Sequence, residues 1–191
     1  MKTLISIAAI AFVLTAFIKV NAVWKSDQVH SQLGFTINHL GVADISGTFN
    51  DFDVTVKATK EDFRDASFLL EAKAASINTR VEDRDHHLKS ADFFDALKYP
   101  IISFKSTGIK IVGNNKYKLT GSSTMHGITK SETLDLFYRG TTENPMNNRQ
   151  TTGFQVTGII KRSDYDIGSK FPSPMLSDEV IIKADGEFLT N

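Results

Sequence analysis

Residues 154–162 read FQVTGIIKR and show the pattern that decides the fold. Alternate positions from Phe154 to Ile160 carry apolar or small side chains, and the positions between them are largely polar. Side chains of a β-strand point to opposite faces with this period of two. The stretch is therefore predicted to be an antiparallel strand that turns one face to a core and the other to water.

The same alternation recurs along most of the chain. Six further runs carry it, at residues 32–39, 67–74, 102–107, 116–123, 133–138 and 180–188, and residues 45–57 form a less regular one. Gly113-Asn114-Asn115 is typical of a tight hairpin turn, and residues 140–153 are expected to form a long exposed loop. About eight antiparallel strands favour an all-β fold, an eight-stranded barrel, because closure removes exposed strand edges. An open two-sheet sandwich is the alternative.

One segment lacks the alternation. Residues 79–98, TRVEDRDHHLKSADFFDALK, are rich in helix formers. Ser90 fits the N-cap of a turn that places Phe93, Phe94 and Leu97 on one side. Pro100 ends the segment, because proline disfavours helix in the residue before it. We expect one or two short helices here, crossing between strands.

The first 22 residues have the layout of a secretory signal peptide. A short positive start precedes an apolar run from Leu4 to Ile18, and a small-residue pattern ends at Ala22. A retained membrane anchor is the alternative, but the run is shorter than the roughly 20 residues that span a bilayer. We therefore expect cleavage near Ala22, one mature domain over residues 23–191, a periplasmic or secreted location, and no stable membrane insertion.

Composition argues against several classes of function. Lysine and arginine total 22, as do aspartate and glutamate, so no basic surface for nucleic acid is expected. Without cysteine the chain has neither disulfides nor thiolate chemistry. It carries no nucleophile elbow, phosphate-binding loop or dinucleotide fingerprint, so we expect no catalytic residue. The five histidines are scattered rather than spaced as zinc ligands, and no metal site is expected.

The positions assigned to the inner face mix bulky aromatic residues with many small ones. Gly47, Ala72, Gly121, Gly158 and Ala184 belong to the small class. An eight-stranded barrel is either just filled by its own side chains or holds one small ligand, and small inward residues favour a cavity. Glycine also suits barrel corners, so a secreted structural barrel with a filled core and no ligand is the alternative.

Several motifs, taken in their order and spacing, resemble the YceI-like family of periplasmic polyisoprenoid-binding proteins. They are WKSDQVHS from Trp24, SGTFNDF around Gly47, SINT from Ser76, RDHHLKSADFFDALKYPIISFKST from Arg84, LTGSSTMHGITK from Leu119, IIKRSDYDIG from Ile159 and LSDEVII from Leu176. The resemblance implies a lipocalin-like barrel with a hydrophobic pore, no catalysis, and binding of isoprenoid chains such as quinone tails or polyprenyl lipids, or of other long amphiphiles. The chain departs from the family pattern at Ser123 and between Arg162 and Gly168.

The pattern and the resemblance together predict which side chains meet a lipid. The expected cavity wall comprises Phe35, Ile37, Phe49, Leu70, Leu88, Phe93, Phe94, Phe104, Leu119, Gly121, Met125, Leu136, Phe154, Gly158, Ile160 and Ile182. Head-group contacts are expected from His39, Arg84, His86 and Arg162. The alternative is that Arg84 and Asp85 pair with neighbours to hold the helix on the barrel, and that Phe93 and Phe94 are core. A homodimer is left open, and no cofactor apart from the lipid is expected.

Overall fold

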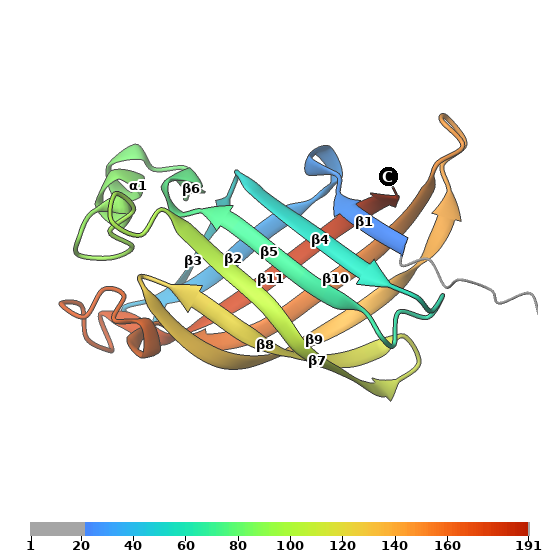
Figure 1. Cartoon of the computed structure of the whole chain (residues 1–191). Helices are drawn as coiled ribbons and strands as arrows, with labels where there is room; N and C mark the ends of the chain where they lie inside the picture. The colour runs from blue at the N-terminus through green and yellow to red at the C-terminus, as the bar shows by residue number, and fades with distance from the viewer. Residues whose placement is uncertain (1–21, 191) are drawn as a thin grey trace, which may run out of the picture.

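The computed structural model describes residues 22–190, so the predicted signal peptide lies almost wholly outside the described residues. Within this range strands dominate, with one α-helix, α1 (Glu82–Lys89), among them (Figure 1). No helix in this range is long and apolar enough to cross a membrane. The strands are β1 (Ala22–Ser26), β2 (Gln32–His39), β3 (Ala43–Phe49), β4 (Phe52–Ala58), β5 (Ser67–Lys73), β6 (Ile77–Asn78), β7 (Ile101–Gly113), β8 (Lys116–Met125), β9 (Ile128–Glu143), β10 (Gln150–Lys161) and β11 (Leu176–Thr190).

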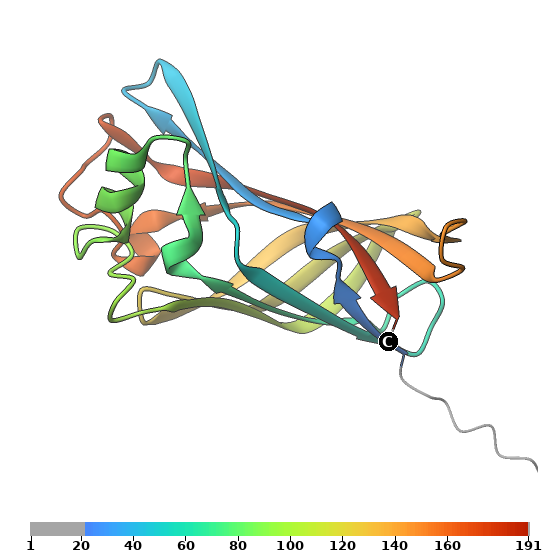
Figure 2. The same ribbon diagram turned by 90° about the horizontal axis from the view of Figure 1, so that it is seen from above.

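The strands close into a barrel of eight antiparallel neighbours. The hydrogen-bonded order runs β1, β4, β5, β7, β8, β9, β10 and β11, and β11 pairs with β1 to complete the ring. Toward α1, β2 takes the place of β1 beside β11, and β3 pairs with β2. Figure 2 shows an elongated barrel with α1 at one end and the C-terminus toward the other. The predicted eight-stranded barrel is confirmed, and the open sandwich is excluded.

Two predicted boundaries are wrong. Residues 45–57 belong to two strands, β3 and β4, because the chain bends between them at Asn50 and Asp51. The exposed loop predicted over residues 140–153 is reduced to residues 144–149, because β9 and β10 remain paired as far as Glu143 and Gln150. At Asn50 and Asp51 two polar residues interrupt one apparent strand, whereas in residues 140–153 polar residues and glycine interrupt the alternation although the β9–β10 ladder continues beside them.

The helical segment agrees with its prediction in part. One helix, α1, is present in residues 79–98, and Ser90 lies at its C-terminal end, while the Ser90 hydroxyl oxygen accepts from Asp92 N at 3.3 Å and so caps the turn that follows, as predicted. The backbone N–H and the hydroxyl of Ser90 both donate to the His87 carbonyl oxygen, at 3.0 and 2.7 Å, which satisfies an acceptor at the helix end. Turns follow, and Leu97 is 98% exposed while Phe93 is buried, so the predicted grouping of Phe93, Phe94 and Leu97 on one side of the turn is wrong.

Packed aromatic rings fill the barrel at the end away from α1. We call this group the aromatic base; it consists of Trp24, Phe63, Phe68, Tyr138, Phe154 and Phe188. Phe63 comes from the connection between β4 and β5, and its ring centroid lies 4.9 Å from those of Tyr138 and Phe154. Phe154 also packs edge-on against Phe68 and Phe188, both at 5.4 Å. Because Phe63 and Phe154 are each 3% exposed, water is excluded from this end of the interior.

Removing the Phe63 ring is expected to destabilise the barrel. Phe63→Ala should lower the free energy of unfolding by about 3–5 kcal/mol, because truncating a buried phenylalanine loses its transfer energy and leaves a void. Urea denaturation measures the change. Phe137→Ala is the control, because Phe137 is half-buried on the outer face of β9; a loss there as large as that of Phe63→Ala would contradict a closing role for Phe63.

Candidate functional site

Two adjoining cavities occupy the rest of the barrel interior. The inner chamber, next to the aromatic base, has a volume of about 150 Å³, and the mouth chamber, beside α1, has a volume of about 380 Å³. Both are lined by Phe35, Phe49, Met125, Ile160 and Ile182, which mark where they meet. An apolar cavity of about 150 Å³ can stay dry and accept a benzene-sized guest. The two chambers together therefore offer room for a longer apolar chain.

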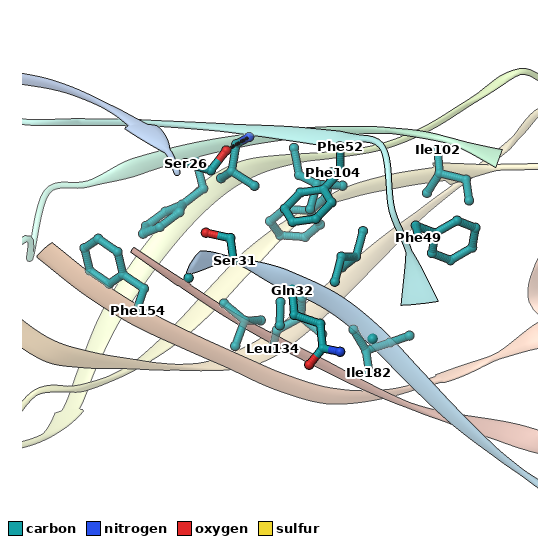
Figure 3. A pocket seen from close by; sticks show the side chains of 18 of the residues that line it. Ser26, Ser31, Gln32, Phe49, Phe52, Ile102, Phe104, Leu134, Phe154 and Ile182 are labelled. Atoms are coloured by element: carbon teal, nitrogen blue, oxygen red, sulfur yellow. Dashed lines mark hydrogen bonds between the residues drawn. The ribbon is translucent and has the colours of Figure 1, made fainter. Parts of the chain in front are cut away.

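The wall of the inner chamber is formed by inward-facing strand residues. Phe104 from β7, Leu134 from β9 and Ile182 from β11 point into the same space (Figure 3). Leu134 and Ile182 are only half-buried although they face inward, so part of their apolar surface borders empty space. Strand alternation places these side chains inside, where Phe104 packs over Gly121 and Leu134 over Gly158 while part of the apolar surface of Leu134 and Ile182 stays uncovered.

Two acidic residues border the inner chamber, and both have partners. The Tyr165 hydroxyl donates to Glu132 Oε1 at 2.8 Å, and burial strongly raises the pKa of Tyr165, so the phenol stays neutral and keeps donating. Asp185 accepts hydrogen bonds from Gln155 Nε2 at 3.0 Å and from Arg139 Nη2 at 3.1 Å. These carboxylates are held by the protein's own donors.

The mouth chamber lies among α1, the turns after it and the connection between β10 and β11, residues 162–175. Phe93 and Phe171 stack with their ring centroids 5.0 Å apart and 14° between the planes, and the His87 ring packs edge-on against both. His39, His87 and Met175 line the chamber and are themselves exposed. The cavity therefore opens to solvent at the α1 end.

Arg162 is buried in the wall of the mouth chamber and organises the connection between β10 and β11. Its guanidinium donates Nε to the carbonyl oxygen of Ser177 (3.0 Å), Nη1 to those of Ile167 (3.0 Å) and Gly168 (2.7 Å), and Nη2 to those of Leu176 (3.0 Å) and Phe171. Guanidinium has five N–H donors, so the protein backbone satisfies all of them. Among the residues that the structure describes, none forms an ion pair with Arg162. Its positive charge is buried without a carboxylate partner.

Lysine should not replace Arg162. It keeps the charge but cannot reach several carbonyl groups at once, and each hydrogen bond to a charged group contributes about 1.5–3 kcal/mol. Arg162→Lys is expected to lower the free energy of unfolding by about 3 kcal/mol or more and to open residues 163–175 to proteolysis. Arg139→Lys, at an exposed site with one bond to Asp185, is the control; equal losses in the two variants would contradict the role of Arg162.

Arg84 carries the second guanidinium group of the mouth chamber, and not all of its N–H donors are used within the protein. Its Nε donates to Thr79 Oγ1 at 2.7 Å and its Nη2 to the Thr79 carbonyl oxygen at 2.8 Å. Asp85 Oδ1 accepts from Thr79 N at 2.7 Å and from Thr79 Oγ1 at 2.5 Å. These bonds hold the start of α1 on the barrel. They match the alternative given in the sequence analysis, in which Arg84 and Asp85 pair with neighbours to hold the helix. Nη1 has no bond to any residue among 22–190.

Asp27, His30 and Glu187 form a cluster outside the cavity, with one oxygen or nitrogen atom of each within 4.8 Å of the others. Asp27 accepts from Val29 N at 3.0 Å and from His30 Nδ1 at 2.8 Å, and so caps the short 3₁₀ turn that separates β1 from β2. The bond between the two side chains lowers the pKa of Asp27 and raises the pKa of His30. The three side chains therefore lie close together because Asp27 caps this turn. The lack of a metal site stays a prediction.

Comparison with known proteins adds a family to this geometry. A model of the YceI-like domain matches residues 24–188. The chain belongs to the YceI-like family. It is 37% identical over 166 residues to the UPF0312 protein SA2479 of Staphylococcus aureus (strain N315), which covers 85% of this chain and 94% of that protein.

Solved structures agree with this assignment. BcnA of Burkholderia cenocepacia gives a TM-score of 0.74 at 25% identity and covers 85% of this chain and 98% of its own. The YceI protein of Campylobacter jejuni gives 0.74 at 29% identity, over 81% and 90%. A polyisoprenoid binding domain from Saccharophagus degradans has the same fold, with a TM-score of 0.66 at 14% identity, over 88% and 98%.

This YceI-like chain brings most of the predicted wall residues to the cavity. Leu70, Phe104, Leu119 and Phe154 line the inner chamber, Ile37, Leu88, Phe93 and Phe94 line the mouth chamber, and Phe35, Phe49, Met125, Ile160 and Ile182 line both. Of the predicted head-group residues, His39, Arg84 and Arg162 line the mouth chamber. His86 is exposed on α1 and does not line either chamber, and neither do Gly121, Leu136 and Gly158.

Gly121 and Gly158 make room for the protein's own side chains instead of for a guest. A Cβ atom on Gly121 would collide with the Phe104 ring and lie 2.6 Å from the Lys105 carbonyl oxygen. A Cβ atom on Gly158 would collide with Leu134. Small inward residues therefore mark close packing across the sheet, and they do not by themselves locate the cavity.

Sequence reasoning missed the part of the mouth chamber that the connection between β10 and β11 builds. Tyr165, Ile167, Phe171 and Met175 line it, but this segment has no strand alternation and its glycine and prolines are typical of a turn. The available signal was the number of apolar side chains within a turn, since turns that only face water are mostly polar.

Proposed function

We propose that this chain binds the tail of a long-chain amphiphilic lipid, such as an isoprenoid carried by a quinone or a polyprenyl lipid, without catalysing a reaction. The observation that carries the proposal is the apolar interior of two adjoining chambers, filled by the aromatic base at one end and open beside α1 at the other. In this role the protein sequesters or carries its guest.

The gain in free energy comes from moving the tail out of water. Each buried CH₂ group contributes about 0.8 kcal/mol, and a tail would also cover the apolar surface of Leu134 and Ile182 that the protein leaves half-buried. The apolar side chains of the wall neither donate nor accept hydrogen bonds, so a hydrocarbon tail leaves none of them unsatisfied. The affinity is therefore expected to depend on the length of the tail more than on its chemical type.

Further support comes from outside the cavity. The fold is shared with a solved polyisoprenoid binding domain, and the family that the chain belongs to is the one that its motifs resemble. The signal-peptide pattern of residues 1–22 fits export to the periplasm or beyond, where the mature chain would work without disulfides. In such an aqueous compartment, a carrier protein would keep a water-insoluble lipid in solution.

A co-purifying guest is the first test. Native protein, extracted with organic solvent and examined by mass spectrometry, is expected to release a long-chain lipid in near-stoichiometric amount. A preparation that is empty, and that also takes up neither hexadecanoic acid nor a short-tailed ubiquinone, would refute the carrier proposal and favour a purely structural barrel.

Filling the junction of the chambers should block uptake. Ile182→Trp places an indole where both chambers meet. Excluding even two CH₂ groups of the tail, at about 0.8 kcal/mol each, would weaken binding about tenfold. Titration with hexadecanoic acid and with a short-tailed ubiquinone measures the change, and urea denaturation checks that the variant folds.

The matched control is the next residue along β11. Ile181 points outward and is 50% exposed, so Ile181→Trp adds the same side chain outside the cavity and should leave binding unchanged. Wild-type affinity in Ile182→Trp, or an equal loss in both variants, would show that the tail does not occupy this junction.

A further inference from the structure

The charged side chains that line the mouth chamber are two arginines, Arg84 and Arg162. Its polar lining side chains are His39, Thr79, Arg84, His87, Arg162 and Tyr165. No aspartate or glutamate lines it among the described residues. The chamber thus combines apolar walls with two permanent positive charges.

Arg162 contributes its charge but no further hydrogen bond. All five of its N–H groups donate to backbone carbonyl oxygens, and no described carboxylate pairs with it. Carbonyl dipoles solvate a cation without cancelling its net charge. Because charges act more strongly next to low-dielectric walls, Arg162 gives the chamber a positive potential.

Arg84 contributes the hydrogen-bond donors. Its Nε and Nη2 are held by Thr79, which fixes the plane of the guanidinium, while its Nη1 meets no acceptor among residues 22–190. A guanidinium fixed in this way is suited to a planar or tetrahedral anion, because charge-assisted hydrogen bonds to carboxylate or phosphate are about twice as strong as neutral ones.

The neighbouring carboxylates keep their charge, but they do not line the mouth chamber and other groups hold them. Asp178 accepts from Ser163 N at 3.0 Å and from Ser163 Oγ at 2.9 Å. Burial acts to raise the pKa of Asp178, but these bonds and the charge of Arg162 lower it. Asp85 is bonded to Thr79, and Asp92 accepts from Lys170 at 2.5 Å and from His87 at 3.2 Å. Glu132 borders the inner chamber, and its carboxylate accepts from the Tyr165 hydroxyl. An anion is therefore favoured at the mouth and disfavoured deeper in the barrel, which orients a guest with its tail toward the aromatic base.

We propose that the mouth chamber selects amphiphiles with an anionic head group, a carboxylate or a phosphate, which Arg84 binds within the positive potential of Arg162. The proposal rests on the proposed function, since it names the head group of the same guest. It makes Arg84 a binding residue and Arg162 a positioning residue that shapes the chamber.

The test compares guests with one tail and different heads. Hexadecanoic acid, hexadecyl phosphate, hexadecanol and hexadecylamine are titrated into delipidated full-length mature protein below their critical micelle concentrations, with native mass spectrometry as the readout. The acid, the phosphate or both should bind about tenfold more tightly than the alcohol and the amine, and the arm that binds better identifies the anion.

Substitutions separate recognition from folding. Arg84→Gln should reduce affinity for the anion about tenfold while affinity for hexadecanol stays unchanged, whereas a merely structural role would weaken both. Arg84→Lys should keep part of the preference. Arg80→Gln removes the same charge from an exposed residue that does not line the chamber, and it should behave as wild type.

Two results would overturn the inference. One leaves the proposed lipid-binding function standing, and the other can refute that function as well. Equal affinity for acid, phosphate and alcohol, or a preference for the amine, would remove the anion selectivity and leave the lipid-binding function standing. If none of the four amphiphiles binds, this inference fails, and the proposed function fails with it when a short-tailed ubiquinone does not bind either.

Discussion

Closure of the sheet is the constraint on which the rest of the structure depends. Because β11 pairs with β1 over one part of its length and with β2 over another, each strand of the ring has a hydrogen-bonded neighbour on both sides. A strand cannot move inward to close a void without breaking these ladders. Space that side chains leave unfilled therefore persists, and the aromatic base fills one end of the interior only.

The strand pattern predicts this architecture well, since the period of two states which residues face inward. It does not show which inward-facing side chains fill the barrel interior and which leave a cavity. Gly121 and Gly158 suggested room for a ligand, but the Phe104 and Leu134 side chains occupy it. Phe63 closes the base from a connection that has no alternation, and Ser90 ends α1 as well as capping the turn for which it was predicted. Such features depend on contacts between residues far apart in the sequence, which local patterns do not contain.

The two arginines of the mouth chamber show the same limit for the site. Both stand in motifs that resemble one family, and both were predicted to contact a head group. The structure separates them by the acceptors around them: Arg162 is surrounded by carbonyl oxygens, whereas Arg84 is held on one side by a single threonine. Residue type alone gives the charge, and the number of unused donors comes only from the fold.

The bonding of Arg162 also makes the opening asymmetric. On one side, residues 163–175 are tied to a buried cation by several charge-assisted bonds. On the other side, α1 is a short helix with no buried residue, and segments with few buried apolar contacts have low local stability. Displacing the connection would break the bonds of a buried cation, whereas α1 is tied only at its start, by the bonds of Arg84 and Asp85 to Thr79. A bulky guest would then enter along the helical side, with the arginine-bound edge as a fixed wall.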